Sequence, residues 1–196
     1  MMTKALAKAF APKVSVNSVA PGVIPMGKED DRIRNLIAKT PAGRAGTPEE
    51  IAIVKNTSEG IATVAMGIDW RPGDKIVCFE EEFPANQYPW RKLEAKGVRI
   101  EWLRTTDPLE KIDEAAKGAR LLTISFVQFL TGYRADLVKI GEICRRRGAI
   151  FFVDAIQGLG AFPLDVQAAN IDALAGDGHK WLLGPEGCGI LYISRK

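Results

Sequence analysis

From residue 51 to the end of the chain, short apolar runs alternate with stretches whose apolar residues recur at helical spacing. Seven of these runs have the length and composition of β-strands. They are residues 51–55, 75–79, 99–103, 121–127, 149–154, 173–176 and 189–194. Strands that alternate with helices form sheets covered on both faces, so the pattern predicts a three-layer αβα domain around a mostly parallel seven-stranded sheet. The run at 149–154 is apolar on both faces, as a central strand should be.

A helix is predicted between the first two strands. Its apolar stripe consists of Ile61, Val64, Ala65 and Ile68. Thr57 and Ser58 stand just before this stripe, where hydroxyl side chains act as N-caps, so we expect them to begin the helix.

The first 50 residues have a different character. They are polar and interrupted by glycine and proline, with a strand-like run in VSVNSVAPG and a capped helix start in TPEEIA. This change near residue 50 predicts two units, an appendage of residues 1–50 and an α/β domain of residues 51–196.

Composition and charge narrow the class of protein. The 196 residues are 46% hydrophobic and 26% charged, which is typical of a globular protein. No apolar run is long enough to span a bilayer, and the first residues lack a secretory signal, so we expect a cytoplasmic protein without a membrane partner. The net charge is only +3, and the basic cluster at residues 145–147 ends a helical pattern at Gly148. No nucleic-acid partner is therefore predicted.

Polar and aromatic residues follow the predicted strands at one edge of the sheet. They are Thr57 and Ser58 after the first strand, Phe83 after the second, Gln128 after the fourth, Asp154 and Gln157 after the fifth, and His179 and Lys180 after the sixth. Ligands of open parallel sheets bind beyond the carboxyl ends of the strands, so these residues form one predicted site.

The residue types indicate what the site could bind. Hydroxyls and free N–H groups at a helix start favour a phosphate, and His179 could donate another hydrogen bond to it. A carboxylate such as Asp154, at the end of an apolar strand, requires a cationic partner, for which a protonated pyridine nitrogen is suitable. Lys180 in an apolar pocket would be an amine ready for imine formation.

Each residue also has an ordinary structural explanation when it is taken alone. Asp154, like Thr57 and Ser58, could be a helix cap, and Phe83 could belong to the core. His179 and Lys180 could be an exposed pair. It is the convergence of the whole set on one edge that favours a functional site.

Four segments carry a resemblance to a known family: KNTSEG, EEEFPANQYPW, FVDAIQGLGAFPLDV and DGHKWLLGPEGCGILY. From about residue 51 to 196 the chain resembles the class V aminotransferases. These are fold-type I pyridoxal 5'-phosphate (PLP) enzymes that include cysteine desulfurases, kynureninase-like proteins and isopenicillin-N-epimerase-like proteins. The resemblance implies the PLP-binding large domain of such an enzyme, working as a homodimer on an amino acid.

The resemblance also implies a role for each site residue. Lys180 would hold PLP as a Schiff base and move the Cα proton of the substrate, Asp154 would pair with the pyridine nitrogen, and Gln157 would contact the ring hydroxyl. The other expected cofactor-binding residues are Thr57, Ser58 and His179 at the phosphate, Phe83 against the ring, and Gln128.

The chain departs from the family pattern in three ways. Desulfurases have a histidine where this chain has Phe83, and the serine common before Gly-His-Lys is Asp177 here. Family members also continue for roughly another domain, which holds the arginine expected to grip the substrate carboxylate. The sequence is therefore expected to represent a truncated large domain.

Residues 3–50 resemble a second family. ALAKAFAPKVSVNSVAPGVI and TPAGRAGTPEEIA are similar to the late part of a short-chain dehydrogenase. The glycine-rich nucleotide loop of that family is not found. The Tyr88 and Lys92 spacing matches its catalytic pair, but it lies inside the PLP-type segment and is interpreted as coincidence. The chain is thus predicted to be a chimera of two unrelated genes.

Three functions remain open at this point. The first is a PLP enzyme acting on an amino acid through Lys180, by transamination, epimerisation or β-elimination. The second is a folded but catalytically inert protein that binds PLP or nothing. The third, an NAD(P)-dependent short-chain oxidoreductase, is disfavoured because it would need a glycine-rich βαβ unit.

Overall fold

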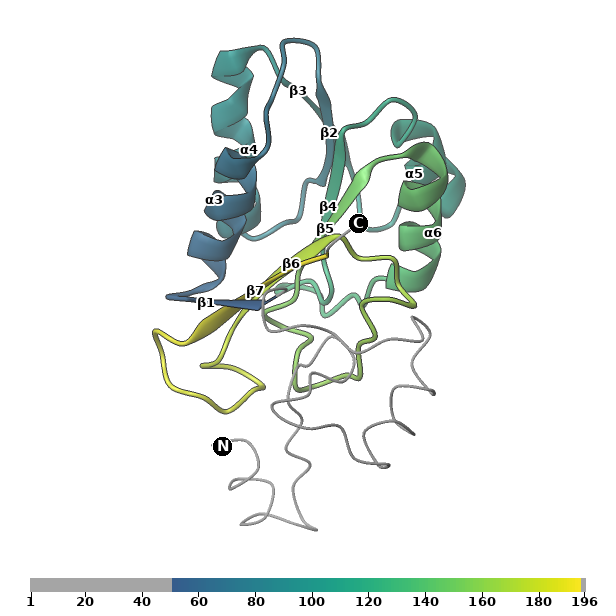
Figure 1. Ribbon diagram of the computed structural model, residues 1–196. Helices are drawn as coiled ribbons and strands as arrows, with labels where there is room; N and C mark the ends of the chain where they lie inside the picture. Colours follow the sequence, from purple (N-terminus) through teal and green to yellow (C-terminus); the bar gives the residue numbers. More distant parts are fainter. Residues whose placement is uncertain (1–50, 195–196) are drawn as a thin grey trace, which may run out of the picture.

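Seven strands form one mixed sheet at the predicted positions in a computed structural model that describes residues 51–194 (Figure 1). The strands are β1 (Ile51–Val54), β2 (Lys75–Phe79), β3 (Arg99–Leu103), β4 (Leu121–Ser125), β5 (Ile150–Asp154), β6 (Ala173–Asp177) and β7 (Gly189–Ile193). Their order in the sheet is β1-β7-β6-β5-β4-β2-β3. The prediction of a mostly parallel sheet with 149–154 at its centre is confirmed.

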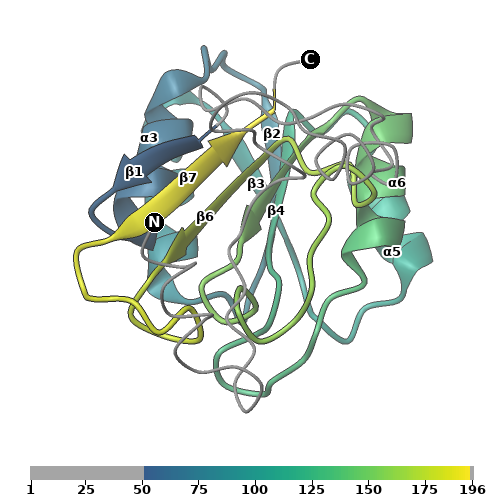
Figure 2. The ribbon, with the colours of Figure 1, turned by 60° about the horizontal axis from the view of Figure 1, so that its bottom comes forward.

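The antiparallel pairs lie together at one edge. β7 pairs antiparallel with both β1 and β6, whereas β6, β5, β4, β2 and β3 run parallel to one another. Figure 2 shows β1, β7 and β6 side by side, with the loop between β6 and β7 extending from the end of β6. All the parallel strands therefore direct their carboxyl ends to the same side of the molecule.

Helices cover both faces of this sheet, as the alternating pattern predicts. The helical elements are α3 (Thr57–Gly67), η2 (Pro84–Asn86), α4 (Tyr88–Arg91), η3 (Lys92–Lys96), α5 (Leu109–Ala115) and α6 (Leu137–Arg147). α3 and α4 pack on one face, and α5 and α6 on the other (Figure 1). The three-layer αβα arrangement is confirmed.

The core is divided between the two faces of the sheet. In β5, Phe151 and Val153 pack in the cluster beneath α5 and α6, while Phe152 packs in the cluster beneath α3 and α4. Successive side chains of a strand point to opposite faces, which is why a strand buried on both faces is apolar throughout. Each fully buried side chain of this size contributes about 1.5–3 kcal/mol.

Helix α3 begins differently from the expectation. Its N-cap is Asn56, whose side-chain oxygen accepts a hydrogen bond of 2.9 Å from the backbone N–H of Glu59. Thr57 is the first helical residue, so the prediction that Thr57 and Ser58 are N-caps is wrong. Because Asn56 satisfies the cap, the hydroxyls of both residues are left available for another partner.

The basic cluster at residues 145–147 has the expected structural role. α6 ends at Arg147, and Gly148 follows in the left-handed conformation, with a φ of 71°. Arg146 and Arg147 both contact the carboxylate of Asp113 on α5, at 2.9 Å and 2.7 Å. The cluster therefore joins two helices on one face of the sheet.

The predicted appendage of residues 1–50, its strand-like run and its helix start lie outside the described residues. Within 51–194, no helix has the length and apolar character required to cross a membrane.

Candidate active site

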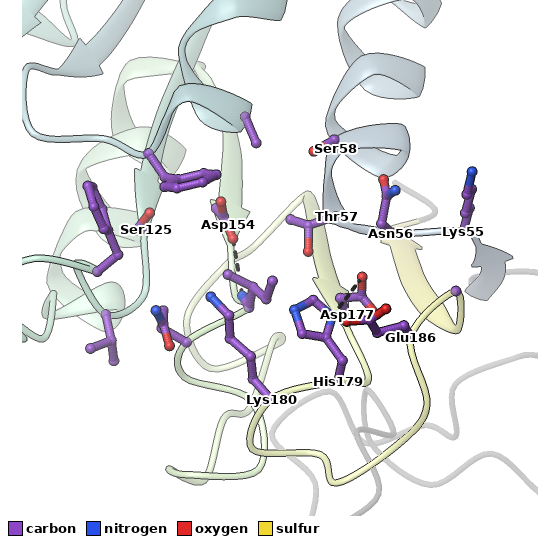
Figure 3. A pocket seen from close by; sticks show the side chains of 17 residues that line it. Lys55, Asn56, Thr57, Ser58, Ser125, Asp154, Asp177, His179, Lys180 and Glu186 are labelled. Carbon is purple, nitrogen blue, oxygen red and sulfur yellow. Dashed lines mark hydrogen bonds and ion pairs between the residues drawn. The ribbon is translucent and has the colours of Figure 1, made fainter.

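A cavity of about 540 Å³ lies beyond the carboxyl ends of β4, β5 and β6 (Figure 3). All the predicted site residues except Gln128 line it. These are Thr57, Ser58, Phe83, Asp154, Gln157, His179 and Lys180. Residues separated by more than 120 positions in the chain are thus brought together, because parallel strands end at the same edge of the sheet.

One end of the cavity is formed by the start of α3. Thr57 is buried, at 3% exposure, and no described group forms a hydrogen bond with its Oγ1. The first N–H groups of a helix also lack intrahelical acceptors. A buried hydroxyl without a partner is costly, and an anion bound at the helix start would provide the missing acceptors.

Asp154, the last residue of β5, forms the floor of the cavity. Its side chain is 2% exposed, and its Oδ1 accepts a hydrogen bond of 3.1 Å from the backbone N–H of Ile156. The pKa of Asp154 is raised to about 7, mainly by burial and to a lesser extent by the negative charge of Glu82, while the Ile156 hydrogen bond and the positive charge of Lys180 act in the opposite direction. A cation placed against Asp154 would stabilise its charged form.

Lys180 and His179 reach the cavity from the turn after β6. Figure 3 shows the Lys180 amine and the Asp154 carboxylate directed into the same space. His179 lies beside Asp177, with 3.1 Å between its Nδ1 and Oδ2 of the carboxylate. Asp177 is the final residue of β6, and its Oδ1 accepts a 2.6 Å hydrogen bond from the N–H of Gly178. The turn that carries Lys180 is therefore held to the end of the strand.

Phe83 forms part of the cavity wall. Phe83 is 48% exposed, so the alternative interpretation of Phe83 as a core residue is wrong. Its ring meets that of Phe129 edge-on, with 5.2 Å between the ring centroids, and both line the cavity. The two rings provide an apolar wall against which a flat ligand can pack.

Gln128 does not line this cavity. Its Nε2 donates to the carbonyl of Glu81 at 2.6 Å, and its Oε1 accepts from the N–H groups of Leu130 and Thr131 at 2.8 and 2.6 Å. The side-chain amide thus stabilises the loop after β4. The structure does not bring Gln128 together with the other predicted cofactor-binding residues. Gln128 follows the end of a strand, as the cofactor-binding residues do, but its polar atoms already form hydrogen bonds with the nearby backbone.

A buried polar network beneath the cavity was not anticipated. Glu82, at 3% exposure, accepts hydrogen bonds from the backbone N–H and the hydroxyl of Ser125, and from Nδ2 of Asn86 at 2.8 Å. Asn86 Oδ1 in turn accepts from Trp90 Nε1 at 2.9 Å and from Thr123 Oγ1 at 2.8 Å. Burial raises the pKa of Glu82, although its hydrogen bonds counteract the effect.

This network left no signal in the sequence. Glu82 belongs to a run of three glutamates, and its partner Ser125 lies 43 positions away. Ser125 also lines the cavity, as do Lys55 and Glu186, which were not among the predicted residues either.

Comparisons with known proteins agree with this architecture. A model of the family described as aminotransferase class-V matches residues 29–196. The chain is 37% identical over 155 residues to a protein of Pyrococcus abyssi named "Probable cysteine desulfurase", in an alignment covering 76% of this chain and 39% of that protein. The chain therefore spans about two fifths of the length of that relative.

Solved structures with the same fold are also found. The apo structure of a cysteine desulfurase from Thermococcus onnurineus NA1 superposes with a TM-score of 0.74 at 27% identity, covering 98% of this chain and 50% of that one. A mutant of C-DES with glycine covalently linked to its PLP cofactor has a TM-score of 0.71 at 23% identity, with 98% and 51% coverage, and shares the fold.

The family match begins at residue 29, so it includes part of the segment that resembles a short-chain dehydrogenase. The dehydrogenase resemblance and the join of two unrelated genes remain predictions.

Proposed function

This chain belongs to the class-V aminotransferase family, and on that premise we propose that it binds PLP in the cavity beyond β4, β5 and β6 and acts on an amino acid. The observation that carries the proposal is the placement of the Lys180 amine and the Asp154 carboxylate in one cavity with the unpartnered hydroxyl of Thr57. PLP is the ligand whose groups match all three.

The residues of the cavity fit this cofactor. Thr57, Ser58 and His179 would hold its phosphate, and Asp154 would pair with the protonated ring nitrogen. Phe83 would pack against the ring, and Gln157 would contact the ring hydroxyl. The fit rests on the Thr57 hydroxyl, which has no hydrogen-bond partner among the described residues, and on the buried Asp154 carboxyl, whose raised pKa a cationic ring nitrogen would offset.

When bound, PLP supplies an aldehyde that condenses with amines and a ring that withdraws electrons from the substrate's Cα. The Asp154 carboxylate would keep a proton on the ring nitrogen and so strengthen that withdrawal. The Lys180 amine would hold the cofactor, and as a free amine it would take the Cα proton of the amino acid.

The reaction branch depends on groups around the substrate. The family resemblance implies that desulfurases have a histidine where this chain has Phe83. A histidine can accept and donate a proton, whereas the phenylalanine ring cannot. Transamination, epimerisation and β-elimination are the branches that Lys180 chemistry supports here. We further propose that the protein works as a homodimer.

The test is the absorbance spectrum of the full chain with added PLP, before and after borohydride reduction. We expect a long-wavelength band in the wild type and in Lys117→Ala, a control that removes an exposed lysine outside the cavity. Lys180→Ala should lack the band, and peptide mapping should find the reduced cofactor on Lys180. A folded protein without the band, or a cofactor trapped on another lysine, would contradict the proposal.

A further inference from the structure

Asp177 is a buried carboxylate with an unusual neighbour at the phosphate end of the cavity. Its side chain is 3% exposed. One oxygen, Oδ1, accepts from the Gly178 N–H at 2.6 Å, and the other, Oδ2, lies 3.1 Å from Nδ1 of His179. Within residues 51–194, His179 is the one side chain that contacts the carboxylate of Asp177 as a possible ion-pair partner. The imidazole is thus the side chain that Asp177 contacts directly.

This contact determines which nitrogen of His179 carries a hydrogen. An ionised carboxylate only accepts hydrogen bonds, so Nδ1 must be the donor in the pair. A neutral imidazole has a single N–H, which leaves its Nε2 as an acceptor. Nε2 becomes a donor only when the ring takes up a second proton.

His179 is placed where this distinction matters. Figure 3 shows the imidazole between Asp177 on one side and the cavity on the other, with Thr57 facing the same space. Its side chain is 34% exposed, so solvent reaches the ring. Phosphate oxygens accept hydrogen bonds, and a neutral His179 held by Asp177 has no hydrogen to offer them.

We propose that Asp177 is a positioning residue that acts through His179, so that His179 contacts the cofactor's phosphate as a donor only in its protonated form. The inference rests on the proposed PLP site and adds to it a phosphate contact coupled to proton uptake. In the family pattern this position is commonly a serine, whose hydroxyl can donate at any pH. Asp177 replaces that direct donor with one that depends on a proton.

The other charged groups of the cavity determine how strong the coupling is. The ionisable side chains that line it with His179 are Lys55, Asp154, Asp177, Lys180 and Glu186. Lys55 attracts a phosphate, whereas Asp177 and Glu186 repel it. A proton on His179 offsets the charge of Asp177, and without it the pair presents a net negative charge to the phosphate. PLP affinity should therefore fall as pH rises.

The experiment compares PLP with pyridoxal, which has the same aldehyde and ring but no phosphate. Both are titrated into the full chain from about pH 6 to about pH 8.5, the range in which histidine changes charge. The measured quantity is the ratio of the PLP affinity to the pyridoxal affinity, since pyridoxal corrects for the pH dependence of condensation with Lys180. The proteins are the wild type, Asp177→Asn, Asp177→Ser, His179→Asn and the double variant Asp177→Asn/His179→Asn.

We expect the ratio to fall about tenfold over this range in the wild type, which corresponds to one charge-assisted hydrogen bond. In Asp177→Asn it should change about twofold or less, because the amide can donate to Nδ1 and the neutral ring then carries its hydrogen on Nε2. In His179→Asn it should change as little, because no imidazole remains. Asp177→Ser should bind PLP about tenfold more tightly than the wild type at the upper pH. In the His179→Asn background, Asp177→Asn should have no further effect on the pH dependence, as required if it acts through the imidazole.

A wild-type ratio that is independent of pH, or the same pH dependence in all variants, would overturn the inference while leaving the PLP site intact. An Asp177→Asn effect that is equal for PLP and pyridoxal would show a structural role and would also overturn it. Should Asp177→Asn fail to fold, His179→Asn still tests the link, since its side chain is one-third exposed. A folded wild type that binds neither compound would contradict the proposed function, and this inference with it.

Discussion

Two of the buried carboxyl groups, Glu82 and Asp154, interact electrostatically with each other. Glu82 is surrounded by donors, with hydrogen bonds from Ser125 and Asn86, whereas Asp154 accepts one bond from the N–H of Ile156. The charge of Glu82 raises the pKa of Asp154 in addition to the effect of burial. The less satisfied of the two carboxyls is therefore the one that lines the cavity, where a cationic ligand group can reach it.

The raised pKa of Asp154 predicts how the stability of the cofactor-free protein depends on pH. The folded value of about 7 lies above the ordinary value of 3.8, so between these values the folded state binds more protons than the unfolded state. Its contribution to stability is full at low pH and is lost as pH rises to about 7. Asp154→Asn should remove this loss, which amounts to at most about 4 kcal/mol.

Urea unfolding without PLP, at about pH 4.5 and about pH 7.5, measures the difference. The raised pKa of Glu82 acts in the same direction in both proteins, so the difference between their pH profiles measures Asp154 together with its coupling to Glu82. Parallel pH profiles for the wild type and Asp154→Asn would show that Asp154 is not the group responsible.

Among the elements, α3 most directly shapes the phosphate end of the cavity. A Cβ at Gly60 would lie 2.7 Å from the Cβ of Ala175 in β6, so the helix approaches the sheet more closely than a larger residue allows. Asn56 caps the same helix. Together the close approach and the cap place Thr57 over the strand ends with its hydroxyl directed to no protein partner.

Two identical substitutions on α3 test this packing. Gly60→Ala should destabilise the protein by about 1–2 kcal/mol, because overpacking outweighs the better helix propensity of alanine. It should also weaken PLP binding by displacing Thr57 and Ser58. Gly67→Ala is the matched control, since no heavy atom lies within 4 Å of its added Cβ. That variant should be neutral or more stable by up to about 1 kcal/mol in urea unfolding. Equal effects of the two substitutions would contradict the close approach.

Across the whole molecule, exposed aromatic side chains gather beside the cavity. Phe129, Phe162 and Trp181 are 45%, 38% and 58% exposed. They line a second hollow of about 620 Å³, which shares Val127, Phe129 and Gln157 with the first. Apolar surface of this kind marks sites of contact with another protein. The proposed homodimer would cover it next to the site.

Trp181→Ser should therefore weaken self-association by more than about tenfold, since buried tryptophans are frequent hot spots of interfaces. Met66→Ser is the control: Met66 is an exposed apolar side chain that lies elsewhere, on α3, so its removal should have no effect. Light scattering during size-exclusion chromatography, over a range of concentrations, measures the change. A wild type that is monomeric at every concentration would refute the dimer.

The seven strands, their alternation with helices and the edge at which the site lies were all predictable from the sequence. These follow from periodicity and from the rule that parallel strands end on one side, both of which can be read from local patterns. Asp154 and Lys180 were found in this way, because each follows an apolar run at a strand end.

Which hydrogen-bond partner each polar side chain has depends on the tertiary structure. In the folded protein, Asn56 rather than Thr57 caps α3, and Gln128 forms hydrogen bonds with its own loop. Glu82 accepts a hydrogen bond from Ser125, which lies 43 positions away in the chain. A polar atom bonds to whichever donor or acceptor lies within about 3 Å, and that distance depends on the packing of distant segments. Hydrophobic pattern is a local property of the chain, whereas hydrogen-bond partnership is a property of the folded whole.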